Sequence, residues 1–394
     1  MSGLRDAGTA RHMLDRGLFG AAGALLLLGL VMVTSASMTI ADREFSDPFH
    51  FAERQAAFAL LGVLAAIVAL EVPLRVWERL APLLLIAALA LLAAVLVPGL
   101  GRTVNGSTRW LAVGPLRVQP SELARLLLVM WLAAYLVKHA AEVRGGFKGF
   151  AKPLAVLGVA SALLLLEPDF GATVVLAATL FAMLFVGGVR LADFLGVVLV
   201  AAGGLLAIAL AQPYRVARLT AFMDPWADPF DSGFQLTQSL IAIGSGEWFG
   251  VGLGQSVQKL FYLPEAHNDF IFAVLAEELG FAGVCAVVVL FGILVWRGLS
   301  IARAAAHAGH GFGAHLALGV TAWLGLQAFV NAAVTMGLLP TKGLTLPLLS
   351  AGGSSLVVAC AAIGLVGRVQ RELDERGAMQ GAAGASAAAA RGAA

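Results

Sequence analysis

The chain has 394 residues, of which 60% are hydrophobic and only 13% are charged, and its formal net charge is +2. Soluble proteins carry about 25% charged residues, so this composition excludes an ordinary soluble domain and indicates an integral membrane protein. Apolar runs of about 20 residues match a helix that crosses the bilayer, whereas a β-barrel would show short alternating segments. Cys285 and Cys360 lie inside apolar runs, which excludes a disulfide framework and a cysteine-based metal cluster.

Ten apolar segments along the chain are predicted to form transmembrane helices. The first follows Arg5, Arg11 and Arg16 and resembles a signal peptide, but its length and the helices after it favour an uncleaved span. An even number of spans places both termini on one side, and the Lys/Arg bias predicts that this side is the cytoplasm. The ten segments are approximately 18–40, 55–73, 80–98, 121–138, 151–167, 171–188, 191–211, 271–296, 314–337 and 345–367.

The same pattern predicts the organisation of the chain. A short cytoplasmic tail, 1–17, precedes a membrane domain, 18–368, and a disordered cytoplasmic tail, 369–394, that is rich in Ala and Gly. Residues 212–270 are expected to form a large extracytoplasmic loop between the seventh and eighth helices. Within this loop, 235–254 is moderately apolar and glycine-rich, which suits an amphipathic or re-entrant segment rather than a spanning helix.

The shorter external segments differ in their expected structure. Residues 42–54 show no special feature, whereas Asn105-Gly106 predicts a tight turn and Glu167-Pro168-Asp169 a tight hairpin between two helices. Pro347 and Gly352-Gly353 predict a broken helix near a cavity. External cations run against the charge bias and are expected to bind something; they are Arg43, Arg54, Arg102, Arg109, Arg117, Arg215, Arg218, Lys259 and Lys342.

Asp269 is the principal candidate for catalysis. It lies at the external start of the helix predicted over 271–296, beside apolar residues that would raise its pKa toward the value of a general base. A helix cap at a membrane boundary needs the same residue in the same place, and the two interpretations are compatible. Arg109, Arg215, Arg218 and Lys342 come from three external loops and could converge on a phosphate, or each could anchor to lipid head groups.

Other polar residues also have two interpretations. Trp110 suits an interfacial anchor, and Glu122 with Arg125 suits a structural pair at helical spacing. His267 could orient Asp269 or remain solvated, and Asp169 suits a turn or a helix cap. Glu277 and Glu278 fall within a bilayer run and need a partner, which could be another chain, a lipid group or Arg125.

Several of these stretches together resemble the SEDS family (shape, elongation, division and sporulation). The resemblance spans roughly residues 18–370 and is closer to the division-type branch than to the elongation-type branch. It departs from the family pattern at Glu247, Asn268, Arg125 and Ala351, of which Arg125 in place of Lys bears on how a pyrophosphate is held. The matching motifs are Arg109-Trp110, Gln119-Pro-Ser-Glu122, Glu167-Pro-Asp-Phe-Gly171, Leu263-Pro-Glu-Ala-His-Asn-Asp-Phe-Ile-Phe272 and Thr341-Lys-Gly-Leu-Thr-Leu-Pro-Leu-Leu-Ser350.

The resemblance implies an all-α, polytopic peptidoglycan glycosyltransferase that polymerises lipid II outside the cytoplasmic membrane, in septal wall synthesis. It places the family's essential aspartate on Asp269 and functionally sensitive positions on Trp110, Glu122 and Lys342. The partners it implies are a class B penicillin-binding transpeptidase of the FtsI type and other divisome proteins. No nucleic-acid partner is expected, and a divalent cation, Mg²⁺ or Mn²⁺, is compatible with the chemistry. A lipid II flippase and a recruiting scaffold are the alternatives from other functional classes.

Overall fold

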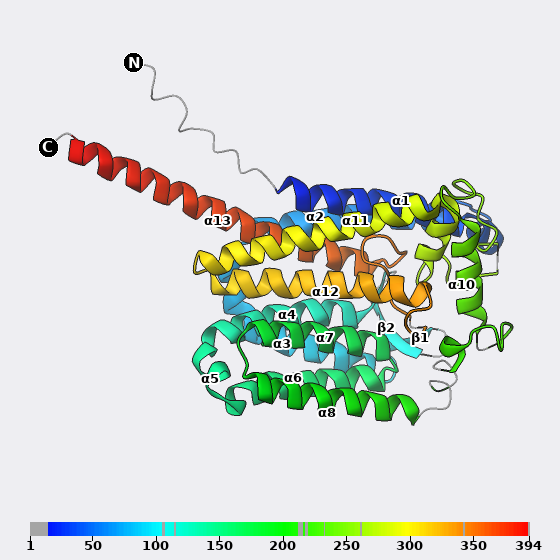
Figure 1. The fold of residues 1–394 in the computed structure, drawn as a ribbon, viewed down its shortest axis with the longest axis horizontal. Coiled ribbons are helices and arrows are strands. Elements are labelled where there is room, and N and C mark those ends of the chain that lie inside the picture. The colour runs from blue at the N-terminus through cyan, green and yellow to red at the C-terminus, as the bar shows by residue number, and fades with distance from the viewer. Residues whose placement is uncertain are drawn as a thin grey trace, which may run out of the picture.

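The computed structural model describes residues 15–392 apart from 105–106, 114–115, 212–215, 217–219, 232, 261 and 342. Long helices run roughly parallel to one another and form an elongated bundle (Figure 1). The helices are α1 (Arg16–Phe45), α2 (His50–Glu71), α3 (Leu74–Val95), α4 (Pro120–Lys138), α5 (Ala140–Gly145), α6 (Phe147–Leu166), α7 (Phe170–Val186), α8 (Leu191–Leu210), α10 (Phe234–Ser245), α11 (Ile271–His307), α12 (Gly311–Thr335) and α13 (Ser354–Gly392).

The fold is that of an all-α polytopic membrane protein, as predicted. Within the described residues, eight helices are long and apolar enough to cross a membrane, and α7 is a shorter apolar helix. The count of ten spans stays a prediction. α10 has 12 residues, or about 18 Å, which is too short to span the hydrocarbon.

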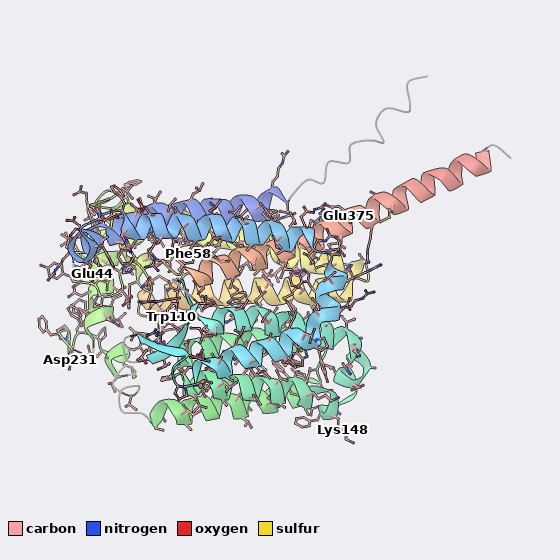
Figure 2. The ribbon with its side chains drawn as sticks, turned by 180° about the vertical axis from the view of Figure 1, so that it is seen from behind. Glu44, Phe58, Trp110, Lys148, Asp231 and Glu375 are labelled. Carbon is pink, nitrogen blue, oxygen red and sulfur yellow. The ribbon has the colours of Figure 1, made fainter. Side chains whose placement is uncertain are left out.

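The centre of the bundle is formed by α4 and α12. α4 packs against α3, α7 and α12, and α12 also packs against α11 and α13. α13 in turn lies against α2, and α1 lies against α11 and α2. α8 lies at one edge and has no buried residue between 191 and 208. Labelled residues identify the two ends of the bundle in Figure 2. Glu44, Trp110 and Asp231 lie toward one end, and Lys148 and Glu375 lie toward the other.

A small sheet lies at the end that carries Glu44, Trp110 and Asp231, and it was not predicted from the sequence. Strands β1 (Gly101–Val104), β2 (Ser107–Val113) and β3 (Leu116–Val118) pair antiparallel in the order β1-β2-β3. The strands form because Thr, Val and Trp favour extended backbone on either side of turn residues. The predicted Asn105-Gly106 turn lies outside the described residues, between strands that pair at Val104 and Ser107.

The last helix differs from its prediction at both ends. α13 begins at Ser354, so Pro347 and Gly352-Gly353 precede the helix in a non-helical approach instead of breaking it. Toward the other end, α13 continues to Gly392 through the segment expected to be disordered. Alanine has the highest helix propensity, which accounts for helix in this tail. The first part is also anchored, since Arg368 Nε donates to Glu372 Oε1 at 3.0 Å in a buried pair.

Candidate active site in an outer groove

A groove lies between the start of α2, strand β3 and the segment before α13. Its larger part has a volume of about 540 Å³ and its smaller part about 190 Å³. The two parts share Phe51, Arg54, Phe58 and Arg117, so they form one continuous outer groove. The other residues of the outer groove are Glu44, Phe45, Gln55, Ala57, Leu61, Trp110, His267, Asn268, Ala351, Gly352 and Gly353.

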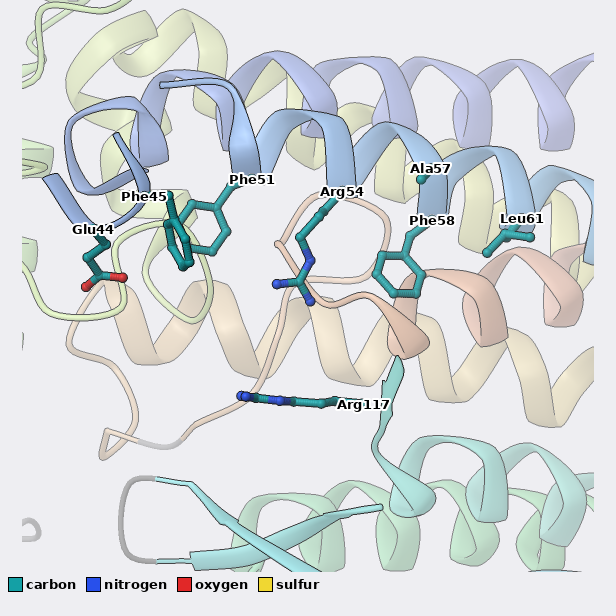
Figure 3. Close-up of a pocket in the computed structure, with 8 residues that line it drawn as sticks. All are labelled: Glu44, Phe45, Phe51, Arg54, Ala57, Phe58, Leu61 and Arg117. Carbon is teal, nitrogen blue, oxygen red and sulfur yellow. The ribbon is translucent and has the colours of Figure 1, made fainter. Parts of the chain in front are cut away.

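Two arginines supply positive charge to this groove. Arg54 extends from the first turns of α2 and Arg117 from β3, and their guanidinium groups point into the same space (Figure 3). Phe58 and Leu61 follow on the same helix and continue the groove as an apolar surface. Paired guanidinium groups bind phosphate oxygens, so the groove suits an anionic head group that carries an apolar chain. The expectation that residues 42–54 hold no special feature is therefore wrong.

His267 and Asn268 line the groove, and the segment 267–269 is held by its backbone. The carbonyl oxygen of His267 accepts a hydrogen bond from Ala351 N at 3.0 Å, and that of Asn268 accepts one from Ser350 Oγ at 2.7 Å. These bonds tie the segment to the chain just before α13. Because consecutive carbonyl groups are fixed in this way, the positions of the side chains on the segment are defined by the fold rather than by solvent.

Asp269 follows directly in chain order and is half-buried. Its carbonyl oxygen accepts a hydrogen bond from Asn331 Nδ2 at 2.9 Å. A Cβ atom on Gly343 would lie 3.1 Å from Asp269 Oδ2, so the carboxylate lies directly beside a residue without a side chain. The N-cap of α11 is Phe270, with no side-chain cap hydrogen bond. Asp269 therefore lies one position before the N-cap of α11.

Glu122 and Arg125 lie beneath this region instead of in the groove. Arg125 is 1% exposed and its Nη1 donates to Glu122 Oε2 at 3.2 Å and to Gln327 Oε1 at 2.6 Å. Gln327 Nε2 in turn donates to the carbonyl oxygen of Thr345 at 3.0 Å. The pair thus supports the chain before α13 through α12. This geometry suits the structural pair expected from their spacing and gives it a positioning role, whereas the resemblance had counted both residues among those that bind substrate.

Arg109 and Trp110 are adjacent on β2 and have different surroundings, as alternation along a strand requires. Trp110 lines the outer groove. Arg109 instead donates to the carbonyl oxygens of Glu167 at 3.3 Å and Pro168 at 2.6 Å, which holds the hairpin between α6 and α7. In this hairpin Asp169 caps α7 by accepting from Ala172 N at 3.1 Å, which confirms its predicted role.

Glu167 is buried in the same hairpin. Both of its carboxylate oxygens lack a hydrogen-bond partner within the described part of the chain. Burial and the nearby Asp169 raise the pKa of Glu167, Arg109 opposes the change, and the resulting pKa is about 8. The side chain is consequently mostly protonated near neutral pH.

His267 lines the groove as a neutral, half-buried ring. Its ring centroid lies 5.0 Å from that of Phe51. Burial lowers the pKa of His267, so the imidazole adds no charge near neutral pH. Among the described residues, its Nδ1 atom has no hydrogen-bond partner. The proposed orientation of Asp269 by His267 stays a prediction.

The two carboxylates near the start of α11 have partners that differ from those expected. Glu278 Oε1 accepts from Lys259 Nζ at 2.7 Å, and Glu278 also accepts from Ser35 Oγ. Glu277 accepts from Val257 N at 2.9 Å and from Ser256 Oγ. Arg125 contacts neither group, so the partner is the loop between α10 and α11. Lys259 was one of the external cations expected to bind a partner, and its partner within the chain is Glu278.

Three predicted cations, Arg215, Arg218 and Lys342, lie outside the described residues. Sequence reasoning missed Asn331 and Gln327, although two amides at i, i+4 spacing in an apolar run are a signal of a buried polar network. Within the described ranges, no group of three or more His, Cys, Asp or Glu side chains has the geometry to hold a metal ion. The described residues thus form no ready-made site for Mg²⁺ or Mn²⁺.

The fold and the site together define a multi-pass membrane protein with a basic, aromatic groove beside a rigidly held aspartate. The chain belongs to the FtsW/RodA/SpoVE family of cell cycle proteins, whose sequence profile matches residues 16–375. This is the SEDS family that the sequence motifs indicate.

Relatives with assigned names match over nearly the whole chain. A "Probable peptidoglycan glycosyltransferase FtsW" of Thioalkalivibrio sulfidiphilus is 58% identical over 381 residues, which is 95% of each chain. The protein of the same name from Legionella pneumophila is 52% identical and covers 91% of each chain.

Solved structures share the fold. One, described as "Structural coordination of polymerization and crosslinking by a peptidoglycan synthase complex", matches with a TM-score of 0.75 at 33% identity, over 91% of this chain and 98% of that chain. The rod shape determining protein RodA of Thermus thermophilus matches with a TM-score of 0.66 at 32% identity, over 91% and 97% of the two chains.

Proposed function

We propose that this chain is a peptidoglycan glycosyltransferase that polymerises lipid II into glycan strands. The observation that carries the proposal is the outer groove, in which Arg54 and Arg117 face a common space beside the anchored segment 267–269. The relatives that share more than half of its residues carry the name of this activity. Lipid II combines a sugar, a pyrophosphate and a long apolar chain, and the groove offers a surface for each.

The reaction requires one base and a cationic environment. The hydroxyl oxygen of an acceptor sugar attacks the anomeric carbon of the donor, with inversion, and a new C–O bond forms. The bond from that carbon to the pyrophosphate oxygen breaks, and the pyrophosphate leaves with the electron pair. Asp269 accepts the hydroxyl proton as general base. Pyrophosphate is a good leaving group, so a second carboxylic acid is not needed, in contrast to glycoside hydrolysis.

The groove residues take the other roles. Arg54 and Arg117 hold the pyrophosphate and stabilise the charge that develops on it. Trp110 offers a flat surface to a sugar ring. Phe58 and Leu61 lie where the groove continues along α2, whose exposed apolar side chains, including Leu60 and Leu64, lead the prenyl chain into the bilayer. The Glu122–Arg125 pair acts from beneath, by supporting the segment that holds Asp269.

Polymerisation by the purified protein in lipid vesicles tests this function directly. Wild-type protein with lipid II is expected to yield glycan polymer, and Asp269→Asn and Asp269→Ala are expected to yield none while still binding lipid II. Asp231→Asn is the matched control, because Asp231 is an exposed acid between α8 and α10. Polymer formed by both Asp269 variants would overturn the base assignment. Transfer of lipid II across the vesicle membrane without polymer would favour the flippase.

The cellular setting follows from the same proposal. The protein acts in the cytoplasmic (inner) membrane at the division septum, with both termini in the cytoplasm and the groove on the outer side. A class B penicillin-binding transpeptidase crosslinks the strands that it makes, and the similarity to a chain of a peptidoglycan synthase complex supports this partner. Co-purification with that transpeptidase from membranes, compared with an unrelated single-span protein, tests the pairing.

A further inference from the structure

Helix α11 is interrupted nine residues after its start, and a loop supplies hydrogen-bond partners that the helix lacks there. Gly280 has φ 66° and ψ −166°, which no α-helix contains. Beyond the break, Phe281 N donates to the carbonyl oxygen of Glu247 at 2.9 Å and Ala282 N to that of Trp248 at 3.1 Å. Residues 247–253, here called the elbow loop, therefore replace the missing turn of the helix.

The hydrogen bonds run in both directions, because the loop also donates to carbonyl groups of the helix. Val251 N donates to the carbonyl oxygen of Glu277 at 2.9 Å, and Gly252 N donates to that of Glu278 at 3.1 Å. Backbone groups on both sides of the break are thus satisfied by the protein itself. Non-helical backbone at the depth of the hydrocarbon is tolerated only where protein buries it or water reaches it, and these bonds bury the break in α11 against the loop.

Glycine allows the two backbones to touch. A Cβ atom on Gly246 would lie 1.9 Å from the carbonyl oxygen of Ala276, and one on Gly250 would lie 2.1 Å from that of Glu278. A Cβ atom on Gly280 would meet Gly250 N at 2.3 Å. The contact leaves no room for water between loop and helix, so the polar backbone is sealed inside the junction.

The outer side of the elbow loop is apolar and exposed. Trp248 is 69% exposed, Phe249 is 83% exposed and Leu253 is 54% exposed. From Trp248 to Leu253 the loop has no charged side chain, and its one charged residue, the exposed Glu247, stands at its α10 end. The Trp248 ring meets Phe281 of α11 edge to face, with ring centroids 5.4 Å apart. The apolar surface of the loop thus continues into the exposed apolar face of α11.

The depth of the break along α11 places it within the hydrocarbon. Trp296 is 62% exposed and Arg297 lies over its ring at 5.8 Å, the pairing expected at a membrane–water interface. Arg297 follows Gly280 by about 17 residues, or about 25 Å of helix, which is less than the ~30 Å of a typical hydrocarbon core. Gly280 and the loop beside it therefore lie a few ångströms inside the opposite boundary.

The inner side of the same junction carries neutralised charge. The Lys259–Glu278 pair has side chains that are 6% and 0% exposed, and Ser35 of α1 completes it. Within the elbow loop, the stretch 248–253 thus presents apolar side chains outward, while its hydrogen bonds to α11 face the protein.

We propose that the elbow loop lies at the hydrocarbon boundary of the leaflet on the groove side, with Trp248, Phe249 and Leu253 inserted among lipid acyl chains. It reaches the membrane from α10 and returns toward the chain that carries Asp269. This assignment does not depend on the catalytic activity.

Site-specific fluorescence in vesicles tests the proposal. Single cysteines at Phe249, Asp231 and Val289, in a background with Cys285→Ala and Cys360→Ala, are labelled with an environment-sensitive NBD dye. Asp231 is exposed between α8 and α10, and Val289 is 58% exposed on α11, so they serve as the aqueous and the membrane control. Phosphatidylcholine vesicles then carry a doxyl quencher either near the head group or near the bilayer centre.

The label at Phe249→Cys is expected to show the blue-shifted emission of the Val289→Cys label. Its quenching should be stronger by the shallow doxyl group than by the deep one, and aqueous iodide should have little effect. Emission and iodide quenching like those of Asp231→Cys would overturn the proposal. Protection from iodide without quenching by either doxyl lipid would also overturn it, because the loop would then be covered by protein. Thermal unfolding of each labelled variant verifies that it is folded.

Discussion

The side-chain nitrogen of Asn331 donates a hydrogen bond to the backbone carbonyl of Asp269 at 2.9 Å and a second to that of Leu344 at 2.6 Å. One buried amide on α12 therefore joins the segment before α11 to the segment before α13. Gln327, one helical turn earlier, holds Thr345 in the same way. These two amides connect the deeply buried Arg125 to the candidate catalytic residue through the core of the bundle.

Replacement of Asn331 by Ala is expected to slow polymerisation without weakening substrate binding. The change leaves two buried carbonyl groups without a donor, at a cost of about 1–3 kcal/mol each. A general base displaced by about 1 Å loses on the order of 100-fold in rate. Turnover should fall while KM for lipid II stays near that of wild type. Phe329→Ala, at an exposed position of the same helix, should leave turnover unchanged, and equal turnover in both variants would contradict the positioning role.

Loss of either groove arginine is expected to weaken the binding of lipid II. Arg54→Gln and Arg117→Gln each remove a charged hydrogen-bond donor, worth about 1.5–3 kcal/mol, so KM should rise on the order of 10-fold. Added salt should reduce the difference from wild type, because the groups are exposed. Arg102→Gln changes an exposed arginine of β1 that does not line the groove, and serves as the control. The proposal for the groove is wrong if all three variants give the same KM.

The Lys259–Glu278 pair is expected to couple strongly in a double-mutant cycle. Lys259→Met leaves a buried carboxylate without its counter-charge and should lower the free energy of unfolding by about 3–5 kcal/mol. Lys259→Met combined with Glu278→Leu should recover most of that loss. Unfolding in detergent micelles, followed by tryptophan fluorescence, measures the effect. Glu71→Gln breaks the more exposed Arg371–Glu71 pair and should change stability by at most about 1 kcal/mol; additive single changes would argue against the buried pair.

Glu167 is expected to make stability depend on pH. Its pKa is raised from 4.5 to about 8 by burial and by Asp169, so the folded state prefers the protonated acid. The stabilising contribution is complete below pH 4.5, is lost as the pH rises to about 8, and changes no further above it. The loss amounts to at most about 5 kcal/mol.

Glu167→Gln should remove this dependence. Its thermal midpoint is expected to match that of wild type near pH 4.5 and to exceed it above pH 8, since glutamine has no charge to bury. The difference between the two proteins isolates Glu167 from the other titrating groups. A constant difference across the whole pH range would contradict the assignment.

Much of the candidate site follows from local sequence. An acid directly before a long apolar helix identifies Asp269, and the i, i+3 spacing of Glu122 and Arg125 identifies their buried pair. Asp169 is predictable as a cap because it stands between two apolar helices. In each case the informative contact joins residues that are near in sequence, or one residue and the boundary of its own helix.

The rest of the site depends on contacts between distant segments. Arg54 and Arg117 line the same groove only because β3 pairs with β2 and the start of α2 faces that sheet. Each of them was recognisable as an external cation that defies the charge bias, but not as one of a pair. The break at Gly280 could not be predicted from the sequence either, because a glycine in an apolar helix does not show which loop will bind the backbone groups that the break leaves free. Lys259 finds Glu278 only after that loop has folded back.

The junction between Gly246 and Gly280 also limits how the chain can vary in length. The carbonyl of Glu247 and the amide of Gly252 are both matched to fixed points on α11, so the number of residues between them is set by the distance between those points. An inserted or deleted residue would shift one end of the loop out of register with α11. Several peptide groups would then lose their hydrogen-bond partners at once. We therefore expect relatives to keep the number of residues in this loop even where its side chains differ.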